Sequence, residues 1–322
     1  MLRRCCTSWM FAPVTSRCVL RFPRPRPGKP LSSSPISFSA SGQVGLILEL
    51  VVFDLDGTLL NSESQISPYT RDTLVMLAER GIAYTVATGR TLHAARDILH
   101  GHGFGLPQIY KNGAMIWSPA ATDYSHTRFL TQAEIQHVLE AVMAQNLTPF
   151  IFTLAPGNYH AIYHTPLRND IEKRLSRSFA ERSEVDVLPV ERMPADADIT
   201  NISALGEPAS IEAIAAMVEN DANLVGYSGD ALEGAALKWI DIHHSDASKG
   251  NAIESLKREL GVQRVVCFGD SDNDMSMFTL ADECYAPENA KPYVKAAASA
   301  VIGHHNEDGI ARFLRERFNL SA

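Results

Sequence analysis

Short apolar runs alternate with stretches of helical spacing after residue 48. Residues 49–53 and 82–87 are compact apolar segments, and each predicts a strand. Between them, Ser67 and Pro68 suit the cap and first turn of a helix that should reach about Arg80. A second helix should follow the second strand. This alternation indicates a right-handed parallel α/β unit.

The pattern changes near residue 130. Just before that point the dipeptide Asn112-Gly113, between two short apolar segments, favours a tight turn. Beyond it, helices and pairs of neighbouring strands replace the strand–helix alternation, which indicates an α+β unit with antiparallel pairs. The expected elements are helices over 133–145, 169–179 and 208–221, and strands over 149–154, 159–164, 198–205, 223–227 and 236–243.

The α/β pattern returns after Ser248-Lys249-Gly250. The expected elements there are a helix over 251–260, a strand over 265–268, a loop over 269–274 and helices over 275–281 and 308–318. The sequence therefore predicts an α/β fold, with a Rossmann-like parallel-sheet core and an inserted α+β domain. The core should comprise residues 49–129 and 244–322, and the insertion residues 130–243.

Composition narrows the class of protein. Hydrophobic residues are 45% of the chain and charged residues 20%, which fits a globular protein and excludes disordered, coiled-coil and fibrous classes. No apolar run approaches the roughly 20 residues that a membrane span needs, so no membrane partner is expected. The formal net charge is −8, whereas proteins that bind nucleic acid need a basic face, so no nucleic-acid partner is expected. The oligomeric state leaves no readable signal.

The first 48 residues differ from the rest of the chain in composition and charge. They contain seven Arg or Lys, no Asp or Glu and six of the 17 prolines, whereas residues 49–322 carry a net charge of −15. We expect this basic extension to be disordered. It resembles an organellar transit peptide, or it marks a bacterial start site placed upstream of a native start near residues 44–48. A secretory signal fits less well, because Arg17 and Arg21 interrupt every apolar stretch.

The expected cellular compartment depends on whether the extension is a transit peptide or an upstream start, and on the cysteines. Outside the extension only Cys267 and Cys284 occur, without the spacing of a zinc site or a disulfide framework. That usage is typical of a reducing compartment. The expected location is cytoplasmic, or organellar if the extension is a transit peptide.

Two carboxylates leave the first predicted strand in the segment Asp54-Leu55-Asp56-Gly57-Thr58-Leu59. Both can point into the crevice at the sheet edge if the backbone turns, and Gly57 supplies that freedom. Taken alone, the segment also fits a plain polar turn.

A second and a third segment are weaker signals. Thr88-Gly89-Arg90 follows the second strand, and a hydroxyl with a free N–H at a helix N-terminus suits a phosphoryl oxygen. The same residues also suit an ordinary helix cap. Lys249 lies beside a glycine, where a lysine is usually solvated.

The fourth segment, Gly269-Asp270-Ser271-Asp272-Asn273-Asp274, follows the strand at 265–268. Three acids and an amide so close together would repel one another without a cation, and oxygen ligands of this kind suit Mg²⁺ rather than zinc. An exposed acidic loop is the alternative.

The four segments in this order resemble the haloacid dehalogenase-like superfamily: Asp-x-Asp-Gly-Thr-Leu, then Thr-Gly-Arg, Lys and Gly-Asp-x-x-Asn-Asp. The insertion between the second and third resembles the cap of Cof-type, subclass IIB, sugar-phosphatase-like hydrolases. The resemblance covers about residues 49–320, including Ala286-Pro287-Glu288-Asn289-Ala290 near the C-terminus. It implies a cap over a phosphate site.

The resemblance also implies roles. Asp54 would be the nucleophile and Asp56 the general acid and base. Asp54, the backbone carbonyl of Asp56 and Asp270 would hold Mg²⁺, with Asp274 orienting its waters. The phosphoryl group would be bound by Thr88, Gly89, Lys249 and Asn273. Further candidate contacts to the substrate, none favoured over another, are Arg90, Asn112, His164 and Arg168.

These roles predict a Mg²⁺-dependent phosphatase acting on small, sugar phosphate-like metabolites through an aspartyl-phosphate. A phosphomutase would use the same chemistry but return the phosphoryl group to the sugar instead of releasing it. A non-catalytic binding protein is a further alternative, although Asp54, Asp56, Lys249 and Asp270 are all retained.

Overall fold

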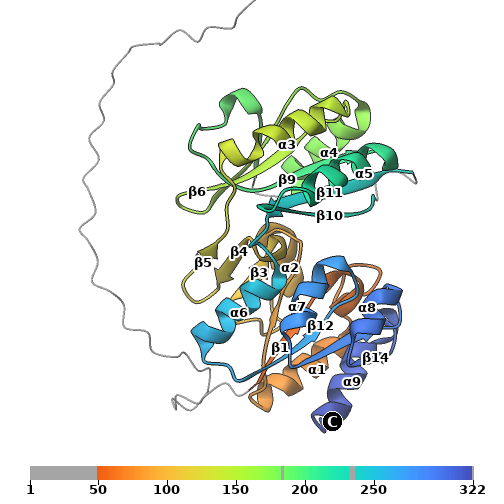
Figure 1. Cartoon of the computed structure of the whole chain (residues 1–322). Helices are drawn as coiled ribbons and strands as arrows, with labels where there is room; N and C mark the ends of the chain where they lie inside the picture. Colours follow the sequence, from red (N-terminus) through yellow and green to blue (C-terminus); the bar gives the residue numbers. More distant parts are fainter. Residues whose placement is uncertain (1–48, 183–184, 232–235, 321–322) are drawn as a thin grey trace, which may run out of the picture. The chain divides into compact units, whose positions relative to one another are not determined.

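The computed structural model describes residues 49–182, 185–231 and 236–320 (Figure 1). The predictions made for residues 1–48, namely disorder and either a targeting segment or an upstream start, lie outside the described residues. In the described part of the chain, none of the helices has the length and apolar character needed to cross a membrane.

A five-stranded parallel sheet forms the core. Its strands, in spatial order, are β14 (Ala300–Ile302), β13 (Glu283–Pro287), β12 (Arg264–Phe268), β1 (Glu49–Phe53) and β2 (Ala83–Val86). Strand β1 is apolar from Leu50 to Phe53 because both faces of the sheet are covered. Leu50 and Val52 point into one apolar cluster, and Val51 and Phe53 into the other.

Helices cover both faces of this sheet. Residues of α6 (Lys249–Leu260) and α7 (Met275–Leu280) belong to one apolar cluster, and residues of α1 (Pro68–Glu79) and α9 (Gly309–Arg317) to the other. The remaining core helices are α2 (Leu92–Leu99) and α8 (Pro292–Ala297). Ser67 caps α1 as predicted, its hydroxyl accepting from the Thr70 N–H at 3.0 Å.

A small antiparallel sheet precedes the insertion. It contains β3 (Gln108–Tyr110), β4 (Met115–Ser118) and β5 (Asp123–Thr127). The turn predicted at Asn112-Gly113 joins β3 to β4, with Asn112 in the left-handed region at φ +53°. Ile109 bridges to Ala87 just beyond β2, which fixes this sheet beside the parallel one.

In its described residues, the insertion is a six-stranded mixed sheet with three α-helices. Its strands, in spatial order, are β10 (Leu224–Asp230), β11 (Lys238–His244), β9 (Asp198–Gly206), β6 (Phe150–Ala155), β7 (Tyr159–His164) and β8 (Asp186–Pro189). All pairs are antiparallel except β7 with β8. Helices α3 (Gln132–Ala144) and α5 (Pro208–Glu219) pack on one face, whereas α4 (Asp170–Arg182) packs against Phe150 and Phe152 of β6.

The predicted fold class is therefore confirmed: a parallel α/β core carries an inserted α+β domain. The expected helices and strands are all present in the described residues, with ends that shift by a few positions. Strands β5, β8, β13 and β14 and helix α8 were not expected.

Candidate active site

Three of the four predicted segments meet at one edge of the parallel sheet. Asp54 follows β1, Thr88 lies just beyond β2, and the acidic segment 269–274 follows β12. Because β1 lies between β2 and β12 and runs parallel to both, the carboxyl ends of these strands share that edge. The Asp54 N–H donates to the Phe268 carbonyl at 2.9 Å, which extends the β1–β12 ladder by one residue.

The fourth segment places Lys249 at the start of α6. The Ser248 hydroxyl caps the helix and accepts from the Asn251 N–H at 3.1 Å. Gly250 allows α6 to begin against α7, since a Cβ there would lie 2.3 Å from the Ser276 carbonyl oxygen. This close approach carries Lys249 into the interior, where its side chain is fully buried.

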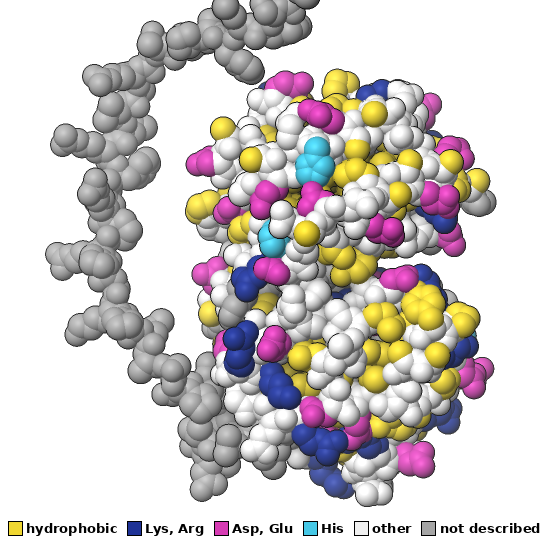
Figure 2. Space-filling view, in the orientation of Figure 1, with side chains coloured by type: hydrophobic (Ala, Val, Ile, Leu, Met, Phe, Trp, Pro, Cys, Tyr) yellow, Lys and Arg dark blue, Asp and Glu magenta, His cyan; other side chains and the backbone are white. Residues whose placement is uncertain are grey.

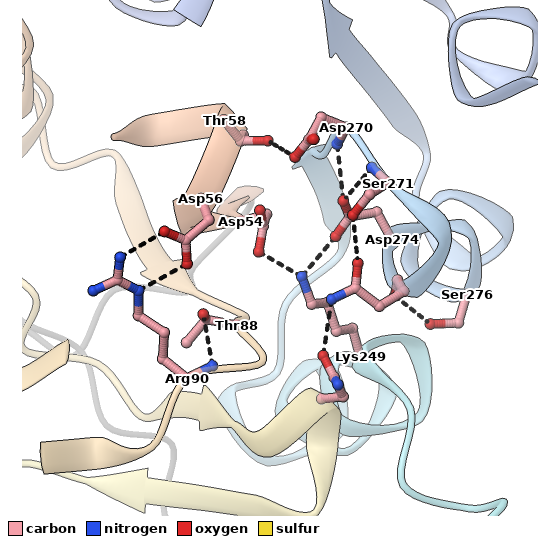
Figure 3. Close-up of polar contacts among 12 residues, drawn as sticks. Asp54, Asp56, Thr58, Thr88, Arg90, Lys249, Asp270, Ser271, Asp274 and Ser276 are labelled. Carbon is pink, nitrogen blue, oxygen red and sulfur yellow. Dashed lines mark hydrogen bonds and ion pairs between the residues drawn. The ribbon is translucent and has the colours of Figure 1, made fainter. Parts of the chain in front are cut away.

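Lys249 bridges two carboxylates (Figure 3). Its Nζ lies 2.5 Å from Asp54 Oδ1 and 2.7 Å from Asp274 Oδ1. Burial lowers the pKa of the Lys249 ammonium, but attraction to Asp274 and Asp54 outweighs burial and leaves that pKa above its ordinary value. The ammonium is therefore a fixed positive charge, and a solvated surface lysine is ruled out.

Asp54, Asp270 and Asp274 form a compact acidic cluster, in which one carboxylate oxygen of each lies within 4.8 Å of the others. Burial raises the pKa of Asp54 well above its ordinary value, although Lys249 opposes the shift. Burial and the charge of Asp274 raise the pKa of Asp270 to about 6. A divalent cation would relieve this repulsion, and the all-oxygen donor set fits Mg²⁺.

Backbone and side-chain donors hold the cluster in place. Asp274 Oδ2 accepts from the N–H groups of Asp270 and Ser271 at 2.8 and 3.0 Å. The Thr58 hydroxyl donates to Asp270 Oδ1 at 2.9 Å. Gly57 makes the approach possible, since its φ is +75° and a Cβ would lie 2.7 Å from Asp270 Oδ2. Asp274 is therefore fully engaged by the protein, whereas no residue in the described ranges donates to Oδ2 of Asp54 or of Asp270.

Asp56 differs from Asp54 in its surroundings. Its side chain is 56% exposed and receives the guanidinium of Arg90, with Nε 2.7 Å from Oδ2 and Nη2 2.5 Å from Oδ1. Arg90 Nη2 also donates to the Ser64 hydroxyl at 3.2 Å. The turn at Gly57 thus directs two acids of one short segment into different environments, one buried and one at the surface.

The other predicted phosphate ligands lie beside these acids. Thr88 is buried, and its Oγ1 accepts from the Arg90 N–H at 3.1 Å. Asn273 donates from Nδ2 to Asn112 Oδ1 at 2.9 Å, so the acidic segment is joined to the turn between β3 and β4. On the face drawn in Figure 2, Lys and Arg side chains lie among Asp and Glu rather than in a continuous basic surface.

A cavity of about 670 Å³ opens on this edge of the sheet. The predicted residues that line it are Asp54, Asp56, Thr88, Gly89, Asn273 and, among the candidate substrate contacts, Arg90 and Asn112. The rest of its lining comes from strands and helix α4 of the insertion and from further core residues, among them His93, Lys111 and Lys291. His164 and Arg168 are not lining residues, and neither are the buried Lys249 and Asp274 or the half-buried Asp270.

A family model described as haloacid dehalogenase-like hydrolase matches residues 51–314. The chain belongs to this family. The hydrolase is 26% identical over 273 residues to the putative phosphatase YxeH of Bacillus subtilis, covering 83% of this chain and 97% of the relative. It is 25% identical over 275 residues to the pyridoxal phosphate phosphatase YbhA of Escherichia coli, covering 82% and 97%.

A solved structure agrees with this assignment. The structure of a subclass IIB sugar phosphatase, BT4131, superposes on the hydrolase with a TM-score of 0.65 at 20% identity. The match covers 85% of this chain and all of the BT4131 chain. At that identity the likeness concerns the fold. Together with the relatives, it makes the hydrolase a phosphatase of the Cof type, as the four motifs predicted.

Several residues around the site of this phosphatase were not found by sequence reasoning. Thr58 positions Asp270, and Asn289 Nδ2 donates to the Gly57 carbonyl at 2.7 Å. Both lie in segments that the resemblance covers, but spacing alone gave them no role. Lys111 and His160 line the cavity, and burial lowers the pKa of His160 to about 4. No motif distinguishes these two residues.

Proposed function

We propose that the hydrolase is a Mg²⁺-dependent phosphatase that cleaves small phosphorylated metabolites through an aspartyl-phosphate on Asp54. One observation carries the proposal: Lys249 joins Asp54 to Asp274, and Asp270 completes an acidic cluster whose member Asp54 lines the cavity. A buried lysine shared by two acids is costly to fold, so we assign it a chemical purpose.

Asp54 is the nucleophile in this proposal. Burial raises its pKa, and the Lys249 ammonium at 2.5 Å opposes that shift and favours the ionised form. Lys249 holds Oδ1, which leaves Oδ2 to attack phosphorus as the bond to the leaving oxygen breaks. The residue lines the cavity, so a phosphoryl group can approach it in line.

The metal site in this proposal uses Asp54, Asp270 and the backbone carbonyl of Asp56. Asp274 orients the surroundings, because its oxygens already accept from Lys249, Asp270 N–H and Ser271 N–H. When bound, Mg²⁺ would neutralise charge on the transferring phosphoryl group and on the two acids that approach it.

Asp56 supplies the proton. Its carboxyl group protonates the leaving alkoxide as the ester bond breaks, and the resulting carboxylate then removes a proton from the water that attacks the aspartyl-phosphate. The Arg90 guanidinium fixes the orientation of the Asp56 carboxyl through two bonds, and both residues line the cavity. The ester is thus converted to an alcohol and inorganic phosphate, and Asp54 is regenerated.

The remaining residues bind the phosphoryl oxygens. Thr88, the Gly89 N–H and Asn273 line the cavity beside Asp54, while Lys249 acts from behind it. The insertion closes the other side, which would exclude bulk water and restrict the substrate to a small molecule. A relative named for pyridoxal phosphate supports a small phosphorylated metabolite.

Phosphate release from a panel of phosphorylated metabolites tests the proposal. Wild type should release phosphate only with Mg²⁺, and Asp54→Asn should release none, because an amide cannot form the phosphoenzyme. Asp72→Asn, an exposed acid paired with Arg71, serves as the matched control and should retain full activity. Activity of Asp54→Asn near that of wild type would overturn the mechanism, and isomerisation without net release would favour the phosphomutase.

A further inference from the structure

We propose that the leaving group of the substrate is an aromatic ring that carries a carboxylate, with the ring against an apolar wall of the insertion and the carboxylate on Lys111. This inference rests on the proposed function, because it names the alcohol that the phosphatase releases. The apolar wall consists of Phe150, Phe152, Ile162, Leu175 and Phe179.

Lys111 is a buried cation that faces the cavity. Only 5% of the residue is exposed, yet it is among the lining residues. Its Nζ lies 3.9 Å from the centroid of the Phe152 ring. Across the described ranges, its ammonium has no hydrogen bond or ion pair to any residue. An ammonium has three donors, and those of Lys111 face the cavity, where a ligand can supply the acceptor.

Asp241 is the acid whose charge acts on Lys111. Burial lowers the pKa of Lys111, and Asp241 partly opposes the shift. Asp241 Oδ1 accepts from the Ser203 hydroxyl and from Asn201 Nδ2, the latter at 3.4 Å. The protein therefore engages this oxygen of Asp241, which also lines the cavity, without pairing it to the Lys111 ammonium.

The backbone ties Lys111 to the phosphate end of the same cavity. Its N–H donates to the Arg90 carbonyl at 3.0 Å, and the next N–H, that of Asn112, donates to the Thr88 carbonyl at 3.0 Å. The cation is thus fixed beside the segment proposed to bind phosphate. Asp54 and Lys111 line the same cavity, whose volume lies within the usual range for small ligands, so we assign the phosphate of one ligand to Asp54 and its carboxylate to Lys111.

The apolar wall favours an aromatic ring over a polyol as the leaving group of the substrate. The rings of Phe150 and Phe152 both meet the ring of Phe179 at 5.6 Å between centroids, with their planes nearly perpendicular. The side chains of the apolar wall carry no hydrogen-bonding group, so sugar hydroxyls placed against them would be buried without partners, although polar residues such as Thr153, Ser178 and Tyr227 also line the cavity. An aromatic ring buries its whole face there and packs edge-to-face or stacked against phenyl groups.

Kinetics with two ring esters and one sugar ester test the proposal. The probes are 3-carboxybenzyl phosphate, benzyl phosphate and glucose 6-phosphate. Wild type should hydrolyse the carboxylated ester with a kcat/KM about 10- to 100-fold above that of benzyl phosphate, since a charged hydrogen bond is worth about one to two factors of ten. Glucose 6-phosphate should be the poorest of the three.

Variants separate binding by Lys111 from a structural role. Lys111→Met keeps the stem on Phe152 but should abolish the preference for the carboxylated ester, mainly through KM, and leave benzyl phosphate nearly unchanged. Lys111→Arg should restore part of it. Lys238→Met, which removes an exposed partner of Glu212, should keep the wild-type preference. An unchanged ratio in Lys111→Met, or a wild type that prefers glucose 6-phosphate, would overturn the inference.

Calorimetry distinguishes this inference from the proposed function. Asp54→Asn, which should bind without turnover, is titrated with 3-carboxybenzyl phosphate alone and in combination with Lys111→Met. A Kd that rises about 10-fold or more with Lys111→Met supports the inference even if no ester is hydrolysed, and an unchanged Kd contradicts it. Absence of hydrolysis of all three esters by wild type counts against the proposed function only.

Discussion

Replacing Lys249 by methionine would leave two buried acids without their shared cation. Lys249 and Asp274 are fully buried and Asp54 is 5% exposed, so water cannot take over the role of the ammonium. Breaking a buried ion pair in this way typically costs about 3–5 kcal/mol of unfolding free energy. We expect a loss of this size at pH 7.5 without divalent cations, while methionine preserves most of the buried volume.

The expected loss depends on pH in a defined direction. Without Lys249, nothing opposes the burial that raises the folded-state pKa of Asp54 above its unfolded value. A carboxyl group with a raised folded pKa destabilises the protein increasingly as pH rises above the unfolded value of about 4. The gap between wild type and variant should therefore be narrower at pH 5.5 than at pH 7.5.

Urea denaturation in the presence of a chelator measures this gap. The double variant Lys249→Met/Asp274→Asn should recover part of the lost stability, because one uncompensated charge is removed. Lys238→Met is the control and should cost at most about 1 kcal/mol, as expected for an exposed pair. A loss below about 1 kcal/mol for Lys249→Met, or a gap that does not change with pH, would refute the reasoning.

Three further outcomes are expected. Asp270→Ala should raise the Mg²⁺ concentration needed for half-maximal phosphate release at least about 10-fold, and an unchanged titration midpoint would remove Asp270 from the metal site. Gly57→Ala should lower the unfolding free energy in urea by about 1–2 kcal/mol through its φ of +75°, so wild-type stability would contradict the strained turn. Burial lowers the pKa of His243 to about 4, so its contribution to stability should fall as pH drops from 6.5 to 4. His243→Gln should flatten that dependence of urea midpoints on pH, and an unaltered slope would contradict it.

The residues at strand ends could be predicted because topology alone brings them together. Once β1, β2 and β12 are expected to be parallel neighbours, Asp54, Thr88 and the acidic segment must share an edge. The local signals were also strong: an apolar run covered on both faces, and a serine–proline helix start. The burial of Lys249 was less predictable, since it depends on Gly250 allowing α6 to meet α7.

The elements that were missed have weak local signals. Strand β5 reads Asp-Tyr-Ser-His-Thr, which has no apolar alternation and depends on pairing with β4. Strand β14 has only three residues, and both β13 and β14 become strands by adding beyond β12 to a sheet whose centre lies elsewhere in the sequence. The position of Lys111 against Phe152 joins residues 41 positions apart, and no pattern in either segment predicts it.

The main-chain pairing of β1 with β12 fixes the relative positions of the acids in the cluster. Phe53 pairs with Phe268 in register, so the starting points of Asp54 and of the segment carrying Asp270 are fixed by main-chain hydrogen bonds. An ion held between these acids would therefore bind to a preorganised site. Removing the ion with a chelator should therefore leave the protein folded and lower its melting temperature only through the loss of ligand binding. Small zinc domains differ, because they unfold when their metal is removed.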